Sequence, residues 1–281
     1  DDKANTGNPF GSKSALMFSG SGDVDGLGTA SFYASTNDNS PAGLLSHNVL
    51  LDMGDAGTIG FDQGVGTFGA GTIDDKSPTA WEESWHNTAN SSGGLIHTGG
   101  SGGVLGYSNA MGGFNLSVEY APSITTADNG DGVAGGDNTS LANGSNVNFA
   151  ITNSSLMDGL TFGVGAGSTE YDDEAIVGRE DGSSAVAFAN YVMGPATVGI
   201  TMSDSNNART ANTTTNAGGR EVEAYGISFA VNDNLSVSYN EHNMTYKKNA
   251  AANPDVEQKS TGIAIAYTMG GATIALQNNS M

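Results

Sequence analysis

The sequence predicts an all-β protein: a transmembrane, antiparallel, up-and-down β-barrel that forms one domain over residues 1–281. Three observations predict it. Bulky apolar residues alternate with small polar residues in short runs, very short turns alternate with long polar segments, and charged residues are only 14% of the chain, against roughly a quarter in soluble domains. A barrel in lipid needs few charges in its strands, because its bulky face meets lipid and its small polar face lines water.

The strand signal is a period of two residues. From 113 to 120, large apolar side chains occupy every second position, and Gly, Asn, Ser and Glu lie between them. Such alternation places the two sets on opposite faces of a strand. The same period recurs in these apolar sets: Phe114, Leu116, Val118, Tyr120; Val147, Phe149, Ile151; Leu160, Phe162, Val164; Val198, Ile200, Met202; Tyr225, Ile227, Phe229, Val231; Leu235, Val237, Tyr239; Ile263, Ile265, Tyr267; and Ile274, Leu276.

Tight turns join the strands in pairs. Asp-Gly, Gly-Gly and Asn-Asp are residues of short hairpin turns, where positive φ angles are required. We predict such turns at Asp25-Gly26, 54–57, 111–113, 157–159, 193–195, 232–234 and 269–271. Long polar segments are expected between the hairpins, at about 36–46, 62–102, 121–145, 169–183, 203–221 and 241–259. The count is about fourteen strands in seven hairpins.

A soluble β-sandwich is the alternative all-β reading. A sandwich hides its bulky face in a core and presents charged residues to water, whereas the second face here is small and neutral. Neither Lys nor Arg is expected inside the hairpin strands. Aromatic residues lie near the expected strand ends, as an interfacial girdle requires: Phe32, Tyr107, Tyr120, Phe188, Tyr191, Tyr239 and Tyr267. These features favour the barrel, whose closure satisfies every strand edge in lipid.

The composition excludes some classes of function. The net charge is −21 with only nine Lys and Arg, so nucleic acid is not an expected partner, because phosphate contacts need basic residues. No cysteine is present, which fits an exported barrel without fixing the compartment. No apolar run approaches the roughly 18 residues of a transmembrane helix, and the polar start of the chain is unlike a signal peptide.

The stretch from Leu50 through Asp52-Met53-Gly54-Asp55-Ala56-Gly57 to Gly60 resembles the strand–turn–strand of α-proteobacterial general diffusion porins of the Rhodobacter type. Segments 113–118 and 224–228 are similar to later strands of that family. The resemblance implies a homotrimer in the outer membrane of a Gram-negative bacterium, in contact with lipid and lipopolysaccharide. It also implies passive diffusion of small hydrophilic solutes, without enzymatic chemistry or cofactor, and a third loop over 62–102 that folds into the lumen.

The chain departs from this family in two ways. The family has sixteen strands and ends in an aromatic residue, whereas the strand signal begins here near Leu16 and the chain stops at Gln277–Met281. Either the terminal strands are missing from this sequence or the barrel closes with fewer, and we expect the former. The family also has an arginine cluster on the lumen wall. Arg179, Arg209 and Arg220 are expected in or beside loops, which puts a strong transverse field in doubt.

The segment from Asp74 to His86 is the most specific local feature, because it holds both tryptophans and four carboxylates. Thr79 is expected to cap a short helix that begins near Ala80. Folded into the lumen, this segment would narrow the pore and favour cations; the alternative is a surface loop at the outer mouth. The predicted constriction consists of the acids Asp62, Asp74, Asp75, Glu82 and Glu83, with Lys76 and Arg220 as the positive counterpart.

Acidic loops could bind Ca²⁺. The run Asp172, Asp173 and Glu174 is the candidate metal site, and a solvated external loop is the alternative. Residues 128–132 resemble part of an EF-hand loop, but the ligands at its first and twelfth positions are absent.

Two other classes of protein are alternatives to a porin. An outer-membrane hydrolase would need a Ser–His pair, and no spacing stands out around His47, His86, His97 or His242. The glycine-rich stretch 99–103 lacks the Lys of a phosphate loop. An acidic surface-layer or adhesive β protein is the stronger alternative, although the repeat expected of a β-roll is absent.

Overall fold

The computed structural model describes residues 16–37, 40–73, 75–85, 103–122, 145–170, 181–206, 217–248 and 254–281. Fourteen antiparallel strands form one sheet in the order β1 to β14. Their bounds are β1 Met17–Val24, β2 Gly28–Asn37, β3 Ser40–Asp52, β4 Thr58–Gln63, β5 Val104–Met111, β6 Phe114–Ala121, β7 Asn146–Asn153, β8 Leu160–Thr169, β9 Gly182–Met193, β10 Ala196–Asn206, β11 Ala217–Asn232, β12 Leu235–Lys248, β13 Val256–Met269 and β14 Ala272–Ser280. The helices η1, Gly54–Ala56, and η2, Ala70–Ile73, are single turns.

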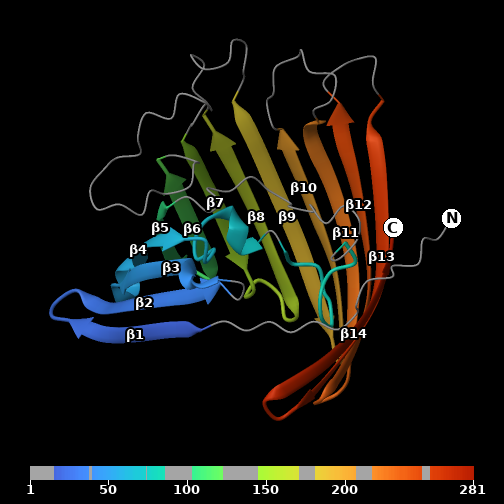
Figure 1. Cartoon of the computed structure of the whole chain (residues 1–281), viewed down its shortest axis with the longest axis horizontal. Coiled ribbons are helices and arrows are strands. Elements are labelled where there is room, and N and C mark those ends of the chain that lie inside the picture. The colour runs from blue at the N-terminus through green and yellow to red at the C-terminus, as the bar shows by residue number, and fades with distance from the viewer. Residues whose placement is uncertain are drawn as a thin grey trace.

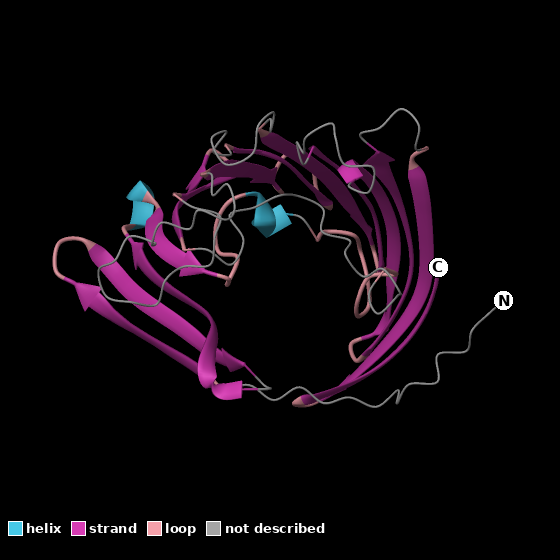
Figure 2. Ribbon diagram, turned by 45° about the horizontal axis from the view of Figure 1, so that its top comes forward, coloured by secondary structure: helices cyan, strands magenta, loops and turns pink. Residues whose placement is uncertain are grey.

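The sheet has the predicted up-and-down topology. Each strand pairs with its neighbours in sequence, and the sheet curves around a central space (Figures 1 and 2). The strand order runs from β1 to β14, and no pairing of those two strands occurs within the described residues. The all-β, up-and-down barrel class and the count of fourteen strands are confirmed, whereas sixteen strands stay a prediction. Within the described part of the chain, no helix is long and apolar enough to cross a membrane.

All seven predicted turns join consecutive strands. The turn after β9 places Gly194 at a φ of 56°, and the turn after β13 places Gly270 at the same angle. Residues with a Cβ rarely adopt this left-handed conformation, so the turn glycines fix where each hairpin reverses. The turn between β3 and β4 is the single-turn helix η1.

Apolar side chains are exposed on one face of the sheet and polar side chains are buried on the other. This arrangement is the reverse of that in soluble proteins. Bulky apolar side chains of the convex face are open, with Val147 50% and Ile263 55% exposed. Asn148, next to Val147 in β7, is 1% exposed, and Ser260 of β13 is fully buried. Because polar groups lie inside and apolar groups outside, the surrounding medium of this face is lipid and not water.

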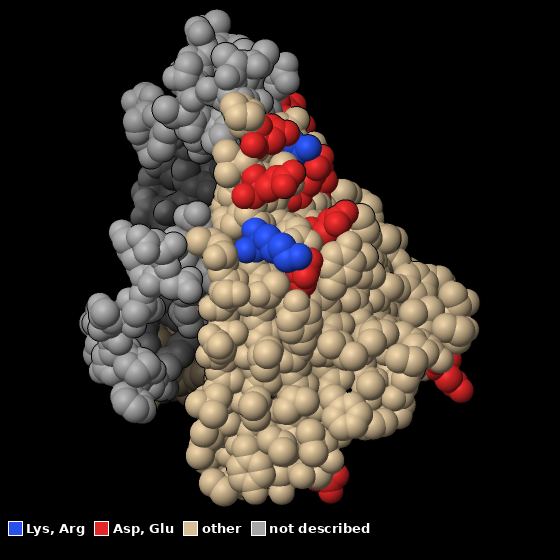
Figure 3. Space-filling view, turned by 90° about the vertical axis from the view of Figure 1, so that its right-hand side faces the viewer, with Lys and Arg blue, Asp and Glu red and all other residues tan. Residues whose placement is uncertain are grey.

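Several strands are longer than the sequence predicts. The prediction that 36–46, 203–221 and 241–259 are loops is corrected, because β2, β3 and β10 to β13 extend into all three segments. The prediction that the strands contain neither Lys nor Arg is therefore wrong, because Arg220 lies in β11 and Lys259 lies in β13. The Lys259 ammonium lies 2.6 Å from the Glu241 carboxylate of β12. Figure 3 shows charged residues gathered toward one end of the outer surface, above a broad uncharged band.

Candidate functional site

The chain leaves the wall of the barrel at Asp62, near the end of β4. Asp62 is 2% exposed, and its two carboxylate oxygens accept hydrogen bonds from the Val65 amide at 2.8 Å and the Thr67 amide at 2.7 Å. Asn48 of β3 also donates to the Thr67 hydroxyl at 2.9 Å. These bonds turn the backbone sharply after β4. Residues 64–73 and 75–85, here called the inner segment, then run along the concave face of the sheet, and η2 lies inside its curve (Figure 2).

The first half of the inner segment is fixed to β6 and β7. The Gly69 amide donates to Ser117 Oγ at 2.8 Å, and the Ala70 amide donates to Asn148 Oδ1 at 2.6 Å. The following helix η2 places Ile73, which is 1% exposed, in a cluster with Val186 and other apolar residues of β7 and β9. Burying an isoleucine stabilises by roughly 1.5–3 kcal/mol, so this end of the segment has an apolar anchor.

The second half is fixed to β9, β12 and β14 through carbonyl groups. Asn190 Nδ2 donates to Lys76 O at 2.8 Å, and Asn240 Nδ2 donates to Pro78 O at 2.7 Å. Gln277 Nε2 donates to the carbonyls of Glu82 and Glu83, both at 2.9 Å. All these donors are neutral amides. The inner segment is therefore held across the concave face by uncharged hydrogen bonds.

Glycines on the wall let the inner segment lie close to it. They are Gly106 of β5, Gly165 of β8, Gly199 of β10, Gly226 of β11 and Gly262 of β13, and an added Cβ at each would meet the segment. At Gly226 this Cβ would lie 2.5 Å from Pro78 O, and at Gly262 it would lie 3.0 Å from Ser84 Cα. A side chain at these positions would separate the segment from the wall.

The helix expected near Ala80 is absent, and that prediction is corrected. Residues 80–85 form bends and turns. The Thr79 hydroxyl donates to Glu82 O at 2.9 Å and accepts from the Trp81 amide at 3.3 Å, while the Ala80 amide donates to Ser238 Oγ of β12 at 2.9 Å. The carbonyls of Glu82 and Glu83, which a helix would pair with amides further along the chain, instead accept hydrogen bonds from Gln277 of β14.

The predicted constriction residues differ in how exposed their side chains are. Asp75 is exposed, whereas Lys76, Glu82 and Glu83 are half-buried. Burial and a hydrogen bond with the Asp75 carboxyl raise the pKa of Glu83 to about 8. Protonated Glu83 can therefore donate to the Asp75 carboxylate at neutral pH.

Arg220 does not join this acidic group. Its guanidinium lies 5.8 Å from the centre of the Tyr246 ring. Ala224, four residues along β11, lines a small cavity with Glu83, so the Cα of Arg220 is about 13 Å further along the strand. Asp62 is also set apart, because its oxygens bind backbone amides.

Some predicted residues lie outside the described part of the chain. Asp74 belongs to this group, as do Asp172, Asp173 and Glu174 of the expected Ca²⁺ loop and residues 86–102 of the expected third loop. Among the described residues no group of three acidic or histidine side chains could hold a metal ion. The third loop over 62–102 and the Ca²⁺ site stay predictions.

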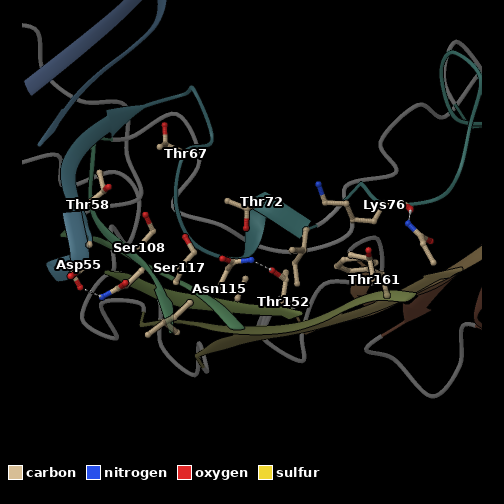
Figure 4. A pocket seen from close by; sticks show the side chains of 18 of the residues that line it. Asp55, Thr58, Thr67, Thr72, Lys76, Ser108, Asn115, Ser117, Thr152 and Thr161 are labelled. Carbon is tan, nitrogen blue, oxygen red and sulfur yellow. Dashed lines mark hydrogen bonds between the residues drawn. The ribbon is translucent and has the colours of Figure 1, made fainter. Parts of the chain in front are cut away.

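A cavity of about 870 Å³ lies between the inner segment and β5 to β10, toward the short turns. Threonine, serine and asparagine side chains make up much of its lining, among them Thr58, Thr72, Ser117 and Thr152. Figure 4 shows the Lys76 side chain reaching into it from the inner segment. A wall of hydroxyl and amide groups stabilises water and small polar solutes without binding one chemical class tightly.

An exposed apolar outer face, consecutive hairpins and an inner segment across the central space are the features of a membrane pore. A family model of Gram-negative porins matches residues 1–277. The chain belongs to the Gram-negative porins. It is therefore an outer-membrane protein, and its fold and family are those of a channel. Among curated proteins, none matches this porin closely enough to count as a relative.

Solved porins share the fold at low sequence identity. The porin refined at 1.8 Å resolution is 18% identical, with a TM-score of 0.64, and the match covers 97% of this chain and 88% of that one. An anion-selective porin from Comamonas acidovorans is 16% identical, with a TM-score of 0.58 and coverage of 95% and 79%. A variant of the Rh. blastica porin is 14% identical, with a TM-score of 0.57 and coverage of 95% and 84%.

The sequence did not single out the residues that hold the inner segment. The amides of Asn190, Asn240 and Gln277 and the wall glycines all lie on the small polar face that the alternation identified. Their position on that face is the signal that could have found them. A small neutral residue at an inward position either meets water or meets a second layer of chain, and the alternation alone does not separate the two cases.

Proposed function

We propose that this porin is a general diffusion porin of the α-proteobacterial Rhodobacter type, which gives small hydrophilic solutes and ions passive passage through a water-filled pore. The observation that carries the proposal is the inner segment, which is hydrogen-bonded to the wall from β6 to β14. A segment held in this way occupies part of the central space and limits the size of what passes. No bond of the solute is made or broken.

We also propose that the pore prefers cations. The supporting observation is a group of carboxylates on the inner segment, Asp75, Glu82 and Glu83, with Lys76 as the cation beside them. Acidic groups at a narrow passage attract cations and repel anions. Asp74 belongs to the same proposal by its place in the sequence. The Comamonas acidovorans relative is anion-selective, so the sign of the preference is a property of each porin's own residues.

The proposed assembly is a homotrimer in the outer membrane, in contact with lipid and lipopolysaccharide. Family resemblance supports the trimer. The open apolar residues of the convex face, such as Phe229 at 42% and Ile265 at 40% exposure, suit either lipid or a second copy of the chain.

Planar-bilayer conductance of the refolded protein under a KCl gradient tests the proposal. We expect stepwise, ohmic openings and a reversal potential on the cation side. A variant with Asp75→Asn, Glu82→Gln and Glu83→Gln should move that potential toward zero. The matched control replaces three acids at the turns, through Asp25→Asn, Asp158→Asn and Asp233→Asn, and should leave the potential nearly unchanged. Both variants are recorded above the Glu83 pKa of about 8, so that each of them has lost three charges.

Each outcome has a separate meaning. An anion-side potential would keep the passive pore and refute the acidic constriction. An equal shift in the turn variant would assign the preference to the net charge of the protein and not to the inner segment. Folded protein that gives no conductance would refute passive diffusion altogether.

A further inference from the structure

Trp81 is a large apolar side chain that the inner segment leaves open. Its exposed fraction is 49%, whereas Phe68 and Ile73 of the same segment are 0% and 1% exposed. Within the described part of the inner segment, Trp81 is the one large apolar residue that is exposed. The segment thus buries Phe68 and Ile73, leaves Trp85 half-buried and presents the Trp81 indole ring to the open space.

Contacts with the wall fix the backbone on both sides of Trp81. The Ala80 amide donates to Ser238 Oγ of β12 at 2.9 Å, and Gln277 of β14 donates to Glu82 O at 2.9 Å. The Trp81 amide itself donates to the Thr79 hydroxyl at 3.3 Å. These bonds occupy the side of the turn that faces the wall, and the indole ring of Trp81 is left exposed beside them.

Carboxylates lie near Trp81 along the inner segment. Glu82 follows Trp81 directly, and Glu83 interacts electrostatically with both Glu82 and Asp75. Asp75 is exposed. An aromatic face attracts cations through its quadrupole, and tryptophan does so most strongly. Quaternary ammonium groups are the cations that fit best, because their methyl groups can lie on the ring while nearby carboxylates balance the charge.

We propose that Trp81, together with the carboxylates of Asp75 and Glu82, forms a binding site for quaternary ammonium solutes inside the pore. The inference rests on the proposed function, since the solute must enter the pore to reach the ring. The site would retain these solutes briefly during passage, so their flux would saturate at concentrations where the flux of K⁺ still rises.

The test compares conductance in choline chloride and in KCl over the same series of salt concentrations. Equal ionic strength gives equal screening of the carboxylates, so a difference between the salts reports on the ammonium group. We expect saturation in choline chloride and a linear rise in KCl. Trp81→Ala should raise the half-saturation concentration of choline roughly two- to fivefold, the change that an exposed cation–π contact produces.

Two further variants and one control complete the design. Trp81→Leu keeps an apolar side chain without an aromatic face and should weaken choline as Trp81→Ala does, while Trp81→Phe should weaken it less. These two variants provide the comparison if Trp81→Ala does not insert. Phe114→Ala removes an aromatic residue of similar exposure, 45%, from the convex face and should leave the choline curve unchanged.

The outcomes separate this inference from the proposed function. Wild-type protein that conducts KCl but shows a linear choline curve would overturn the Trp81 site alone. An unchanged half-saturation concentration of choline in Trp81→Leu would overturn the aromatic contribution and assign retention to the carboxylates. Absence of conductance in both salts would instead refute passive diffusion.

Discussion

Replacing Gly226 with alanine should disturb the attachment of the inner segment. The new Cβ would lie 2.5 Å from Pro78 O and 2.7 Å from Asn240 Nδ2, so Pro78 must move by about the 0.9 Å that separates 2.5 Å from an ordinary contact of 3.4 Å. That shift breaks the 2.7 Å hydrogen bond from Asn240 to Pro78 O. Asn240 is 3% exposed, and leaving such buried groups unpaired costs about 1–3 kcal/mol.

The substitution also has an opposing effect. Replacing glycine with alanine restricts the unfolded chain and stabilises the protein by roughly 0.4–1 kcal/mol. We therefore expect Gly226→Ala to lower the free energy of unfolding by about 1–2 kcal/mol. Single-channel conductance should fall as well, because Pro78 moves away from the wall and into the open space.

Urea unfolding of the refolded barrel and bilayer recording measure these two effects. The control is Gly22→Ala in β1, where an added Cβ meets nothing within 4 Å; this variant should be unchanged or slightly more stable. If Gly226→Ala matches Gly22→Ala in both unfolding midpoint and conductance, then the close approach of Pro78 to β11 does not position the inner segment.

Three further predictions follow from the inner segment. The raised pKa of Glu83, about 8, means that its carboxyl is neutral below this pH and charged above it, so the cation-side reversal potential should grow as pH rises through about 8 and should stay flat in Glu83→Gln. Asp62→Asn has one acceptor oxygen for the amides of Val65 and Thr67, so urea unfolding should show a loss of about 1–3 kcal/mol; an unchanged midpoint would exclude a role of Asp62 in the turn. Lys76→Ala removes the ammonium that reaches into the cavity and should increase cation preference, whereas an unchanged preference would show that Lys76 does not face the ion path.

The strands and turns could be predicted because the lipid enforces their pattern. Every outward position between the interfaces must be apolar, so the period of two residues is clear in β6, β7 and β13. Beyond the membrane interfaces, outward positions no longer have to be apolar. There β11 to β13 continue as polar strands with cross-strand ion pairs such as Lys259–Glu241. Backbone hydrogen bonds hold these ends, and they leave little trace in the hydrophobic pattern.

The acidic character of the inner segment was readable from the sequence, but its geometry was not. Residue type alone identified Trp81, Glu82 and Glu83 as candidates. The helix predicted there is instead a turn that Ser238 and Gln277 hold in place. Those partners lie more than 150 residues away along the chain. Local propensity cannot register such distant bonds, which is why sequence patterns located the segment and missed its shape.

Neutral hydrogen bonds hold the inner segment, so its position does not depend on the salt concentration of the surrounding water. Bonds between amides and carbonyls do not depend on ionic strength, whereas attraction between exposed carboxylates and passing ions weakens as salt screens it. The width of the passage and its preference for one sign of charge therefore depend on different atoms. A cell that moves from dilute to saline water would keep the same molecular sieve while its discrimination between ions declines, and mutation can alter either property without the other.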